Sequence, residues 1–548
     1  MTHVCQRWRG VVLDSPISWV YIPFHCPKWV PEMTKRSKST NLKIELNSKS
    51  CIQSRLSAVR EFLVVHLSRI QSIELYHPAP KKVFLQALFQ DLPAHSARCL
   101  ERLNLRDSLV YPQDSNAMTL IERLLDGSPR LRRLRMRCAM DWSSKILTDL
   151  THLILHHEGG TVTKTTHAEF IDALTRMPAL RKLHLHNVPL PAPPTEKRSS
   201  EPSNIVDLPQ LESILLFGPP LVVCNVLRYI SFPGGTRFRL TLDVSMASDV
   251  AVISSLFRGR YMSTNVAIKW PLARSLNLTV EDDEARMTAW THSSQHTIRD
   301  GGLSLPDSED DFLELNLLWS FRSSTPNVEE IKAQAILEMC SALPFRSLTM
   351  LSVISEVELA GINAESLAEA LGRQPDVQSV HVEGPTLKAF LGFLAAGAQM
   401  RDFSKATMNL PSLRYLSIYD GKFKKNWLSV QVLQNILTQR KQLRMKLKHV
   451  DLKRCSYLFA SDLKTMRKSV YKVTWDKFVS AHASSESPSS SSEDVSDADG
   501  EDSSNSSSSE NDSDEDSSSS SDSSSSSSSV SSASPSTSLS TSSSSESD

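Results

Sequence analysis

The chain has 548 residues, of which 40% are hydrophobic, and its 61 Lys and Arg residues balance 61 Asp and Glu residues. The balance is uneven, because residues 484–548 hold 15 acidic and no basic residues, which leaves 61 basic and 46 acidic residues in the first 483. No apolar stretch reaches the length of about 20 residues that a membrane-spanning helix needs, the N-terminus lacks the apolar core of a signal peptide, and the 8 cysteines form no CxxC pair. We therefore expect a reduced cytoplasmic or nuclear protein without a disulfide framework or a zinc ribbon.

The N-terminal residues 2–13 (THVCQRWRGVVL) have the apolar spacing of an amphipathic helix, through Val4, Cys5, Trp8, Val11 and Val12. The helix should end at Asp14-Ser15-Pro16, because a proline disfavours helical geometry in the residue before it. Trp19 follows as an apolar anchor. Such a short helix needs packing partners to be stable.

The segment VCQRWRGVVLDSPISWVYI resembles the second half of an F-box as found in fungal (basidiomycete-type) F-box proteins, and residues 28–46 resemble the stretch that follows it in that family. The resemblance implies that Val4, Cys5, Trp8, Val11 and Trp19 hold an adaptor-binding half-domain together or contact the Skp-type adaptor of a cullin–RING ubiquitin ligase. The first half of the family's F-box, with its Leu-Pro segment and first helix, has no counterpart here. Either further residues precede this sequence in the gene product, or the adaptor is bound weakly or not at all.

A short apolar pattern, with apolar residues at positions 1, 4 and 6, recurs along the chain. Six copies start 30, 31, 19, 30 and 31 residues apart: Ile70-Ile73-Leu75, Leu100-Leu103-Leu105, Leu131-Leu134-Met136, Leu150-Leu153-Leu155, Leu180-Leu183-Leu185 and Leu211-Ile214-Leu216. Weaker copies are Ala273-Leu276-Leu278, Phe345-Leu348-Met350, Val377-Val380-Val382 and Leu413-Leu416-Ile418. The last two positions of each copy lie two apart, so they predict a short strand with one buried face.

Between these strands, residues 116–125 and 168–177 have apolar spacings of three and four, which predict helices on the outer side. A strand and a helix in about 30 residues indicate an α/β fold of the leucine-rich-repeat-like solenoid class, with parallel strands inside and helices outside. F-box proteins commonly carry such repeats, which agrees with the resemblance. We expect a partial F-box at residues 1–22, a connecting segment at 23–65 and the solenoid at 66–475.

The repeat pattern is interrupted at residues 219–345, where we expect an irregular insert. The acidic stretch around residues 281–311 is expected to be a surface excursion. The proline-rich stretch 189–203 (PLPAPPTEKRSSEPS) is expected to be a loop.

The strand register predicts which side chains face the binding surface. If the apolar positions point inward, the alternate positions point to the concave face, which is the usual binding surface of a solenoid. In four successive repeats these positions form a basic, His-rich patch: Arg102 and Arg106, then Arg133, Arg135 and Arg137, then His152 and His156, then Lys182, His184 and His186. Arginine pairs well with phosphate or carboxylate, so an acidic or phosphorylated protein target is expected there, unless the residues are only a solvated face. Later repeats differ at these positions and offer an apolar-aromatic surface suited to a peptide: Ser213, Leu215 and Phe217, then Tyr415, Ser417 and Tyr419.

The tail 484–548 is too polar and Ser-rich to fold and should be disordered. It is either a solvating tail or an acidic arm, phosphorylated at Ser491 or Ser513, that competes for the basic patch.

No sequence motif of an enzyme, a metal site or a cofactor site is present, so no catalysis, metal or cofactor is expected. The first hypothesis is a substrate-recruiting F-box subunit of an SCF-type ubiquitin ligase, with no membrane partner. The alternative is a nucleic-acid or chromatin-associated protein, whose basic body would bind phosphates while its acidic tail limits non-specific contact.

Overall fold

The computed structural model describes residues 6–477, apart from residues 48–51, 77–87, 91, 94–96, 107–114, 127, 138–140, 158–165, 192–204, 263–272, 292–312, 323–324, 344, 346, 360, 372–373, 397–407 and 425–427. Val4, Cys5, the tail 484–548 with Ser491 and Ser513, and most of the expected loop 189–203 lie outside the described residues.

Seventeen strands of the described chain form one sheet. Their pairings give the spatial order β1 (Tyr21–Pro23), β2 (Leu42–Asn47), β3 (Ile70–Tyr76), β4 (Arg102–Arg106), β5 (Arg133–Arg137), β6 (His152–His156), β7 (Lys182–His186), β9 (Ser213–Gly218), β11 (Arg237–Val244), β14 (Leu313–Phe321), β13 (Glu284–Trp290), β12 (Ser275–Val280), β15 (Met350–Ser355), β16 (Ser379–Glu383), β17 (Tyr415–Tyr419), β18 (His449–Lys453) and β19 (Lys472–Trp475). All pairs are parallel except the two that β13 makes. β8 (Val206–Asp207) and β10 (Ile230–Ser231) form a separate parallel pair.

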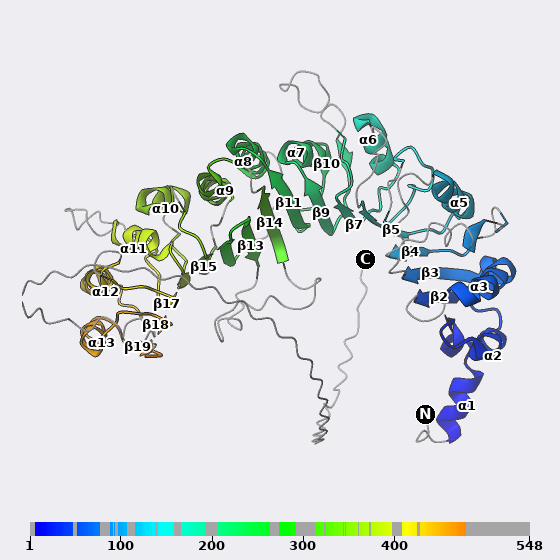
Figure 1. Cartoon of the computed structure of the whole chain (residues 1–548), viewed down its shortest axis with the longest axis horizontal. Helices are drawn as coiled ribbons and strands as arrows, with labels where there is room; N and C mark the ends of the chain where they lie inside the picture. Colours follow the sequence, from blue (N-terminus) through cyan, green and yellow to red (C-terminus); the bar gives the residue numbers. More distant parts are fainter. Residues whose placement is uncertain are drawn as a thin grey trace, which may run out of the picture. The chain divides into compact units, whose positions relative to one another are not determined.

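Helices alternate with the strands and lie along one side of the sheet (Figure 1). They are α1 (Gln6–Asp14), α2 (Val30–Arg36), α3 (Ile52–His66), α5 (Ser115–Leu125), α6 (His167–Thr175), α7 (Pro220–Arg228), α8 (Ala247–Met262), α9 (Val328–Ala342), α10 (Ala364–Leu371), α11 (Leu387–Ala396), α12 (Val430–Gln442) and α13 (Ala460–Arg467), with the short 3-10 helices η1 (Pro16–Trp19), η2 (Pro27–Trp29) and η3 (Leu67–Arg69). We call the opposite side, on which no described helix lies, the open face of the sheet.

The recurring apolar pattern produces these strands. In β6, Leu153 and Leu155 are fully buried while His152, Ile154 and His156 are only partly buried on the open face. Fully burying an aliphatic side chain contributes roughly 1.5–3 kcal/mol, so each strand adds two or three such terms to a core shared with its neighbours. All six stronger copies coincide with a strand, and so do the copies at 273–278, 377–382 and 413–418.

One weaker copy was assigned in the wrong register. Met350 was expected to point into the core, but it is only partly buried and pairs with Ser275, whereas Leu351 and Val353 pair with Leu276 and Leu278 and are buried. The buried triplet in this repeat is therefore Leu348-Leu351-Val353, because the preceding Phe345 belongs to the turn before the strand.

Successive repeats are joined by the same backbone hydrogen bonds. The carbonyl of Glu101 accepts from the N–H groups of Arg132 and Arg133, at 2.9 and 3.0 Å. The carbonyl of Gln378 accepts from Arg414 and Tyr415 in the same way, at 2.8 and 2.9 Å. The same arrangement in both halves of the sheet shows that these repeats are structurally equivalent.

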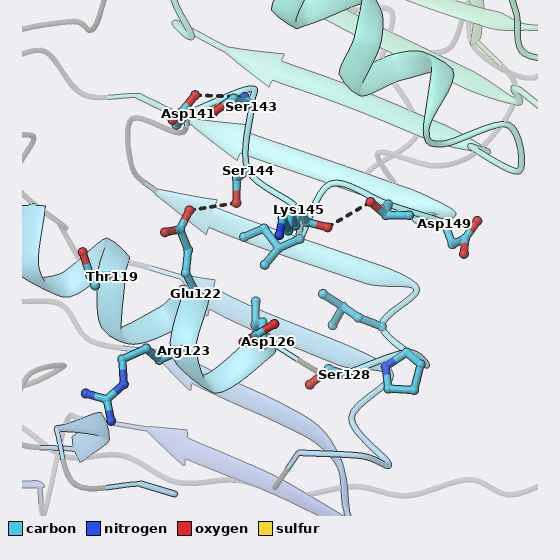
Figure 2. A pocket seen from close by; sticks show the side chains of 15 residues that line it. Thr119, Glu122, Arg123, Asp126, Ser128, Asp141, Ser143, Ser144, Lys145 and Asp149 are labelled. Carbon is cyan, nitrogen blue, oxygen red and sulfur yellow. Dashed lines mark hydrogen bonds between the residues drawn. The ribbon is translucent and has the colours of Figure 1, made fainter. Parts of the chain in front are cut away.

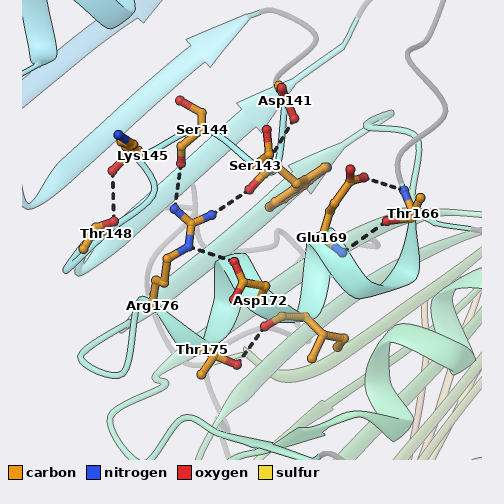
Figure 3. Close-up of polar contacts among 12 residues, drawn as sticks. Asp141, Ser143, Ser144, Lys145, Thr148, Thr166, Glu169, Asp172, Thr175 and Arg176 are labelled. Carbon is orange, nitrogen blue, oxygen red and sulfur yellow. Dashed lines mark hydrogen bonds and ion pairs between the residues drawn. The ribbon is translucent and has the colours of Figure 1, made fainter.

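Three arginines also connect neighbouring repeats through side chains. Arg69 donates to the carbonyl of Thr40, Arg176 to those of Trp142 and Ser144, and Arg440 to those of Asn409 and Leu410. Arg69 ends η3, Arg176 follows α6 and Arg440 lies in the last turn of α12. Each reaches about one repeat back along the chain, as Figure 3 shows for Arg176. The guanidinium groups thus donate hydrogen bonds to backbone carbonyls of loop residues outside the sheet, which have no strand partner.

The irregular region contains the one reversal of the sheet seen among the described strands. The chain passes from β11 to β12, returns through the antiparallel β13 to β14 beside β11, and then continues to β15 beside β12. The expected surface excursion at residues 281–311 is therefore wrong for its first part. Residues 284–290 form a central strand whose Ala285, Met287 and Ala289 are buried, and their alternation with polar residues is the signal that the acidic composition obscured.

Candidate functional site

The open face of β4 to β7 brings the predicted target-binding residues together. The register pairs Arg102 with Arg133, Arg133 with His152, and His152 with Lys182 in one row across the strands. A second row pairs Arg137 with His156 and His186, and a middle row contains Arg135, Ile154 and His184. We call these residues the arginine–histidine patch: Arg102, Arg133, Arg135, Arg137, His152, Ile154, His156, Lys182, His184 and His186. The backbone of Arg106 lies in β4, but its side chain is outside the described residues.

The predicted alternation places all of these side chains away from the core. Leu103, Leu134, Leu153 and Leu183, which alternate with them, are at most 1% exposed. Neighbouring strands are about 4.8 Å apart, so side chains paired within one row are close enough to act on one ligand.

The histidines of the patch are held by specific contacts. The rings of His156 and His186 are stacked, with centroids 4.1 Å apart and planes 6° from parallel. Nε2 of His184 is 2.9 Å from the hydroxyl of Ser213 on β9. The sequence predicted Ser213 on the same face but assigned it to the apolar-aromatic surface of the later repeats; the pairing of β7 with β9 places it beside the histidines.

The tautomer of His152 follows from its hydrogen bonds. The hydroxyl of Thr151 donates its proton to the carbonyl of Arg132 at 2.9 Å, and the same oxygen lies 2.9 Å from Nδ1 of His152. Because the hydroxyl proton is already used, Nδ1 of His152 must donate, which leaves Nε2 of the neutral ring as an acceptor.

The positive charge of the patch comes from its arginine and lysine side chains at neutral pH. Burial, together with the nearby cations Arg133 and Lys182, lowers the pKa of His152 to about 4. Burial and the stacked His186 also lower the pKa of His156 to about 4. These two imidazoles are therefore neutral at pH 7 and offer hydrogen bonds rather than charge.

A second surface lies at the N-terminal end of the sheet. Trp8 and Val11 on α1 are 63% and 54% exposed, and Ile17 and Trp29 on the following segments are 73% and 56% exposed. Trp19 has another role, because its indole N–H donates to the carbonyl of Val12 at 3.1 Å. We call the exposed set, Trp8, Val11, Val12, Ile17, Tyr21 and Trp29, the N-terminal apolar surface.

This end of the molecule is also part of the sheet. β1 and β2 lie within the segments expected as partial F-box and connecting segment, and β2 pairs with β3, so the sheet starts before residue 66. The guanidinium of Arg36 on α2 stacks on the ring of Trp19, 4.7 Å from its centroid, which anchors α1 to the body.

A cavity of about 680 Å³ lies on the helical side, between α5 and residues 141–149 (Figure 2). The hydroxyl of Ser144 donates to Glu122 at 2.8 Å, and the N–H of Ser143 donates to Asp141 at 2.9 Å. The lining mixes acidic residues with Arg123 and Lys145 and contains none of the predicted site residues.

The described residues contain no cluster of three or more His, Cys, Asp or Glu side chains arranged to hold a metal ion. No described helix is long and apolar enough to cross a membrane. A comparison of the sequence with known protein families found no matching family model, and a comparison with curated proteins found no match.

Proposed function

We propose that this chain is a non-catalytic recruiting protein, which binds a protein target on the open face of its sheet and an adaptor at its N-terminal end. The observation that carries the proposal is the arginine–histidine patch, a contiguous group of cationic and neutral imidazole side chains on a face that no described helix covers.

The architecture supports a leucine-rich-repeat-like solenoid. Parallel strands carry the buried apolar triplets, helices lie along one side of the sheet, and equivalent hydrogen bonds join repeats in both halves of the sheet. Proteins built in this way bind partners on the strand face, where a row of side chains from successive repeats can follow an extended ligand.

The chemistry of the patch favours an acidic or phosphorylated segment of the target. Arg133, Arg135 and Arg137 project from one strand and can form charge-assisted, bidentate bonds with carboxylate or phosphate oxygens. The neutral rings of His152 and His156 add hydrogen-bonding capacity beside them.

The target site is tested with the full chain and a fluorescein-labelled peptide of glutamate and phosphoserine, by fluorescence anisotropy. Arg133→Glu/Arg135→Glu/Arg137→Glu should weaken binding by about a hundredfold, roughly 2.7 kcal/mol, and leave thermal unfolding unchanged, because all three side chains lie off the core. Unchanged peptide binding by this variant would refute the assignment of the patch.

The adaptor arm of the proposal is supported by the resemblance to an F-box and by the N-terminal apolar surface. A cluster of exposed large apolar side chains is typical of a protein–protein interface. The proposed partner is a Skp-type adaptor of a cullin–RING ligase, which would place the bound target close to the ligase.

A pull-down with a purified Skp-type adaptor tests this arm. Trp8→Ala/Val11→Asp should abolish any binding, while Val65→Asp, at a 69% exposed position of α3, should not. Equal capture of the adaptor by all three proteins would exclude the N-terminal apolar surface as the binding site. Binding of single-stranded or duplex nucleic acid that falls steeply with salt would instead favour the chromatin-associated alternative.

A further inference from the structure

A second cavity, of about 570 Å³, lies on the open face far from the arginine–histidine patch. It crosses β15 to β18 near the starts of these strands, and its lining includes Arg274, Gln378, Ser379, Tyr415, His449 and Asp451. We call it the C-terminal groove. None of the residues of the arginine–histidine patch lines it.

The floor of the groove consists of side chains in register on neighbouring strands. Ser379 pairs with Tyr415, and Tyr415 pairs with His449, so these three lie in one row across the sheet. The ring of Tyr415 is 43% exposed. From the start of β12 to β18 there are four strand steps, about 19 Å, which is the length of about six residues of extended peptide.

A row of cationic residues runs along the starts of the strands: Arg274 lines the groove, and Arg414 and Lys448 continue the row directly before the lining residues Tyr415 and His449. Arg274, Arg414 and Lys448 occupy equivalent positions, each one residue before its strand, and the carbonyls of Arg274 and Arg414 accept the N–H groups of Thr349 and Lys448 at 2.7 and 2.8 Å. All three side chains are exposed, and none has an acidic partner in the part of the chain that the structure describes.

The end of the groove at β18 offers hydrogen-bond acceptors. The hydroxyl of Thr474 donates to the carboxylate of Asp451, and Nε2 of His449 lies 2.9 Å from the same hydroxyl oxygen. Since the hydroxyl proton is used, Nε2 of His449 carries the donated proton. Burial lowers the pKa of His449, so the ring is neutral and its Nδ1 is an acceptor.

We propose that the C-terminal groove binds an extended acidic peptide segment of a partner protein, with its carboxylates along the cationic row and a backbone N–H group at the acceptors of β18. Arg274 and Arg414 are three strand steps apart, about 14 Å, which matches residues i and i+4 of an extended peptide at about 3.4 Å per residue. Residues i and i+4 project from the same side of an extended chain, whereas residues i and i+3 project from opposite sides.

The groove therefore selects glutamates spaced by four. A nucleic acid fits less well, because its uniformly spaced phosphates would bring negative charge to the carboxylate of Asp451.

The test uses the full chain carrying Arg133→Glu/Arg135→Glu/Arg137→Glu, so that the arginine–histidine patch does not contribute. A fluorescein-labelled eight-residue peptide of serine and glycine with glutamates at i and i+4 is titrated by anisotropy. Adding Arg274→Glu/Arg414→Glu should weaken its binding by about tenfold or more. Adding Lys388→Glu/Lys464→Glu, an equal charge change on exposed positions of α11 and α13, should change binding by less than about twofold.

The peptide with glutamates at i and i+3 should bind about fivefold more weakly than the i, i+4 peptide. Three results would overturn the proposal: no binding of the i, i+4 peptide, equal binding after Arg274→Glu/Arg414→Glu, or tighter binding of an oligonucleotide of equal charge. If Arg274→Glu/Arg414→Glu lowers the unfolding temperature, Arg274→Gln/Arg414→Gln replaces it and should still weaken binding. The arginine–histidine patch is tested separately, by comparing Arg133→Glu/Arg135→Glu/Arg137→Glu with the wild-type chain. The proposal for one site can therefore be refuted without refuting the other.

Discussion

Replacing Arg176 by methionine tests whether arginine contacts hold neighbouring repeats together. Arg176 follows α6, and its two terminal nitrogens donate to the carbonyls of Ser144 and Trp142 at 2.9 and 2.8 Å (Figure 3). The indole of Trp142 is 1% exposed and packs edge-on against Phe170, 4.6 Å between ring centroids. The arginine thus holds in place the segment that contains the buried Trp142.

The expected loss can be worked out from these contacts. A hydrogen bond to a charged group contributes about 1.5–3 kcal/mol, so two such bonds contribute about 3–6 kcal/mol. The side chain of Arg176 is 24% exposed, and water can replace part of the lost bonding, which reduces the expected loss to about 2–4 kcal/mol. Methionine keeps most of the apolar stem, so little packing is lost. Arg176→Lys retains one bond at most and should lose about half as much.

Hydrogen exchange followed by mass spectrometry gives the most local readout. Peptides covering residues 141–149 should exchange faster in Arg176→Met, and urea unfolding should show the loss of stability, while peptides from α12 and β18 should be unaffected. Arg130→Met, at an exposed arginine, is the matched control and should leave both measurements unchanged. Protection of residues 141–149 that equals that of the wild type would refute the reasoning.

Three further outcomes are expected. Gly384→Ala should cost more than about 3 kcal/mol of unfolding free energy in a urea titration, because Gly384 has φ +79° and an added Cβ would collide with the carbonyl of Ser355; a loss below about 1 kcal/mol would contradict this. The wild-type protein should lose stability as pH falls from about 6.5 towards 4, because His152 and His156 stay neutral in the folded protein and bind protons once it unfolds. The unfolding free energy should change by at most about 1.4 kcal/mol per pH unit for each ring, and by less for these half-buried rings. This pH dependence should flatten in His152→Gln/His156→Gln. Iodoacetamide should label the exposed Cys26 in the folded protein but not the three buried thiols, because burial raises the pKa of each buried thiol to about 12; these are Cys224, Cys340 and Cys455. Alkylation of any of the three at a rate similar to that of Cys26 would contradict this prediction.

The sequence predicts much of this fold because apolar periodicity reports burial directly. The strands at Leu103, Leu134 and Leu183 follow from the triplets alone, as does the open-face position of the side chains between them. The same pattern is present in Leu447-Val450-Leu452, whose last two residues lie in β18, although it was not among the predicted copies.

Other features depend on long-range pairing that periodicity does not encode. The reversal through β13 requires knowing that β14 pairs with β11, and the composition around residue 284 suggested a polar surface instead. The contacts from Arg176 and Arg440 to carbonyls about one repeat back depend on where loops leave the sheet. The histidine tautomers likewise depend on hydroxyls that only the folded chain brings close.

The most direct test of the recruiting function is photocrosslinking from the middle of the arginine–histidine patch. Ile154 lies on the open face with Arg135 on one side and His184 on the other. With Ile154→p-benzoylphenylalanine, irradiation should attach the labelled glutamate and phosphoserine peptide to this position, and an excess of unlabelled peptide should prevent it. The same replacement at Val65, on the exposed surface of α3, should give no crosslink. A crosslink from Val65 as strong as that from Ile154, or none from Ile154 at saturating peptide, would contradict binding on the open face.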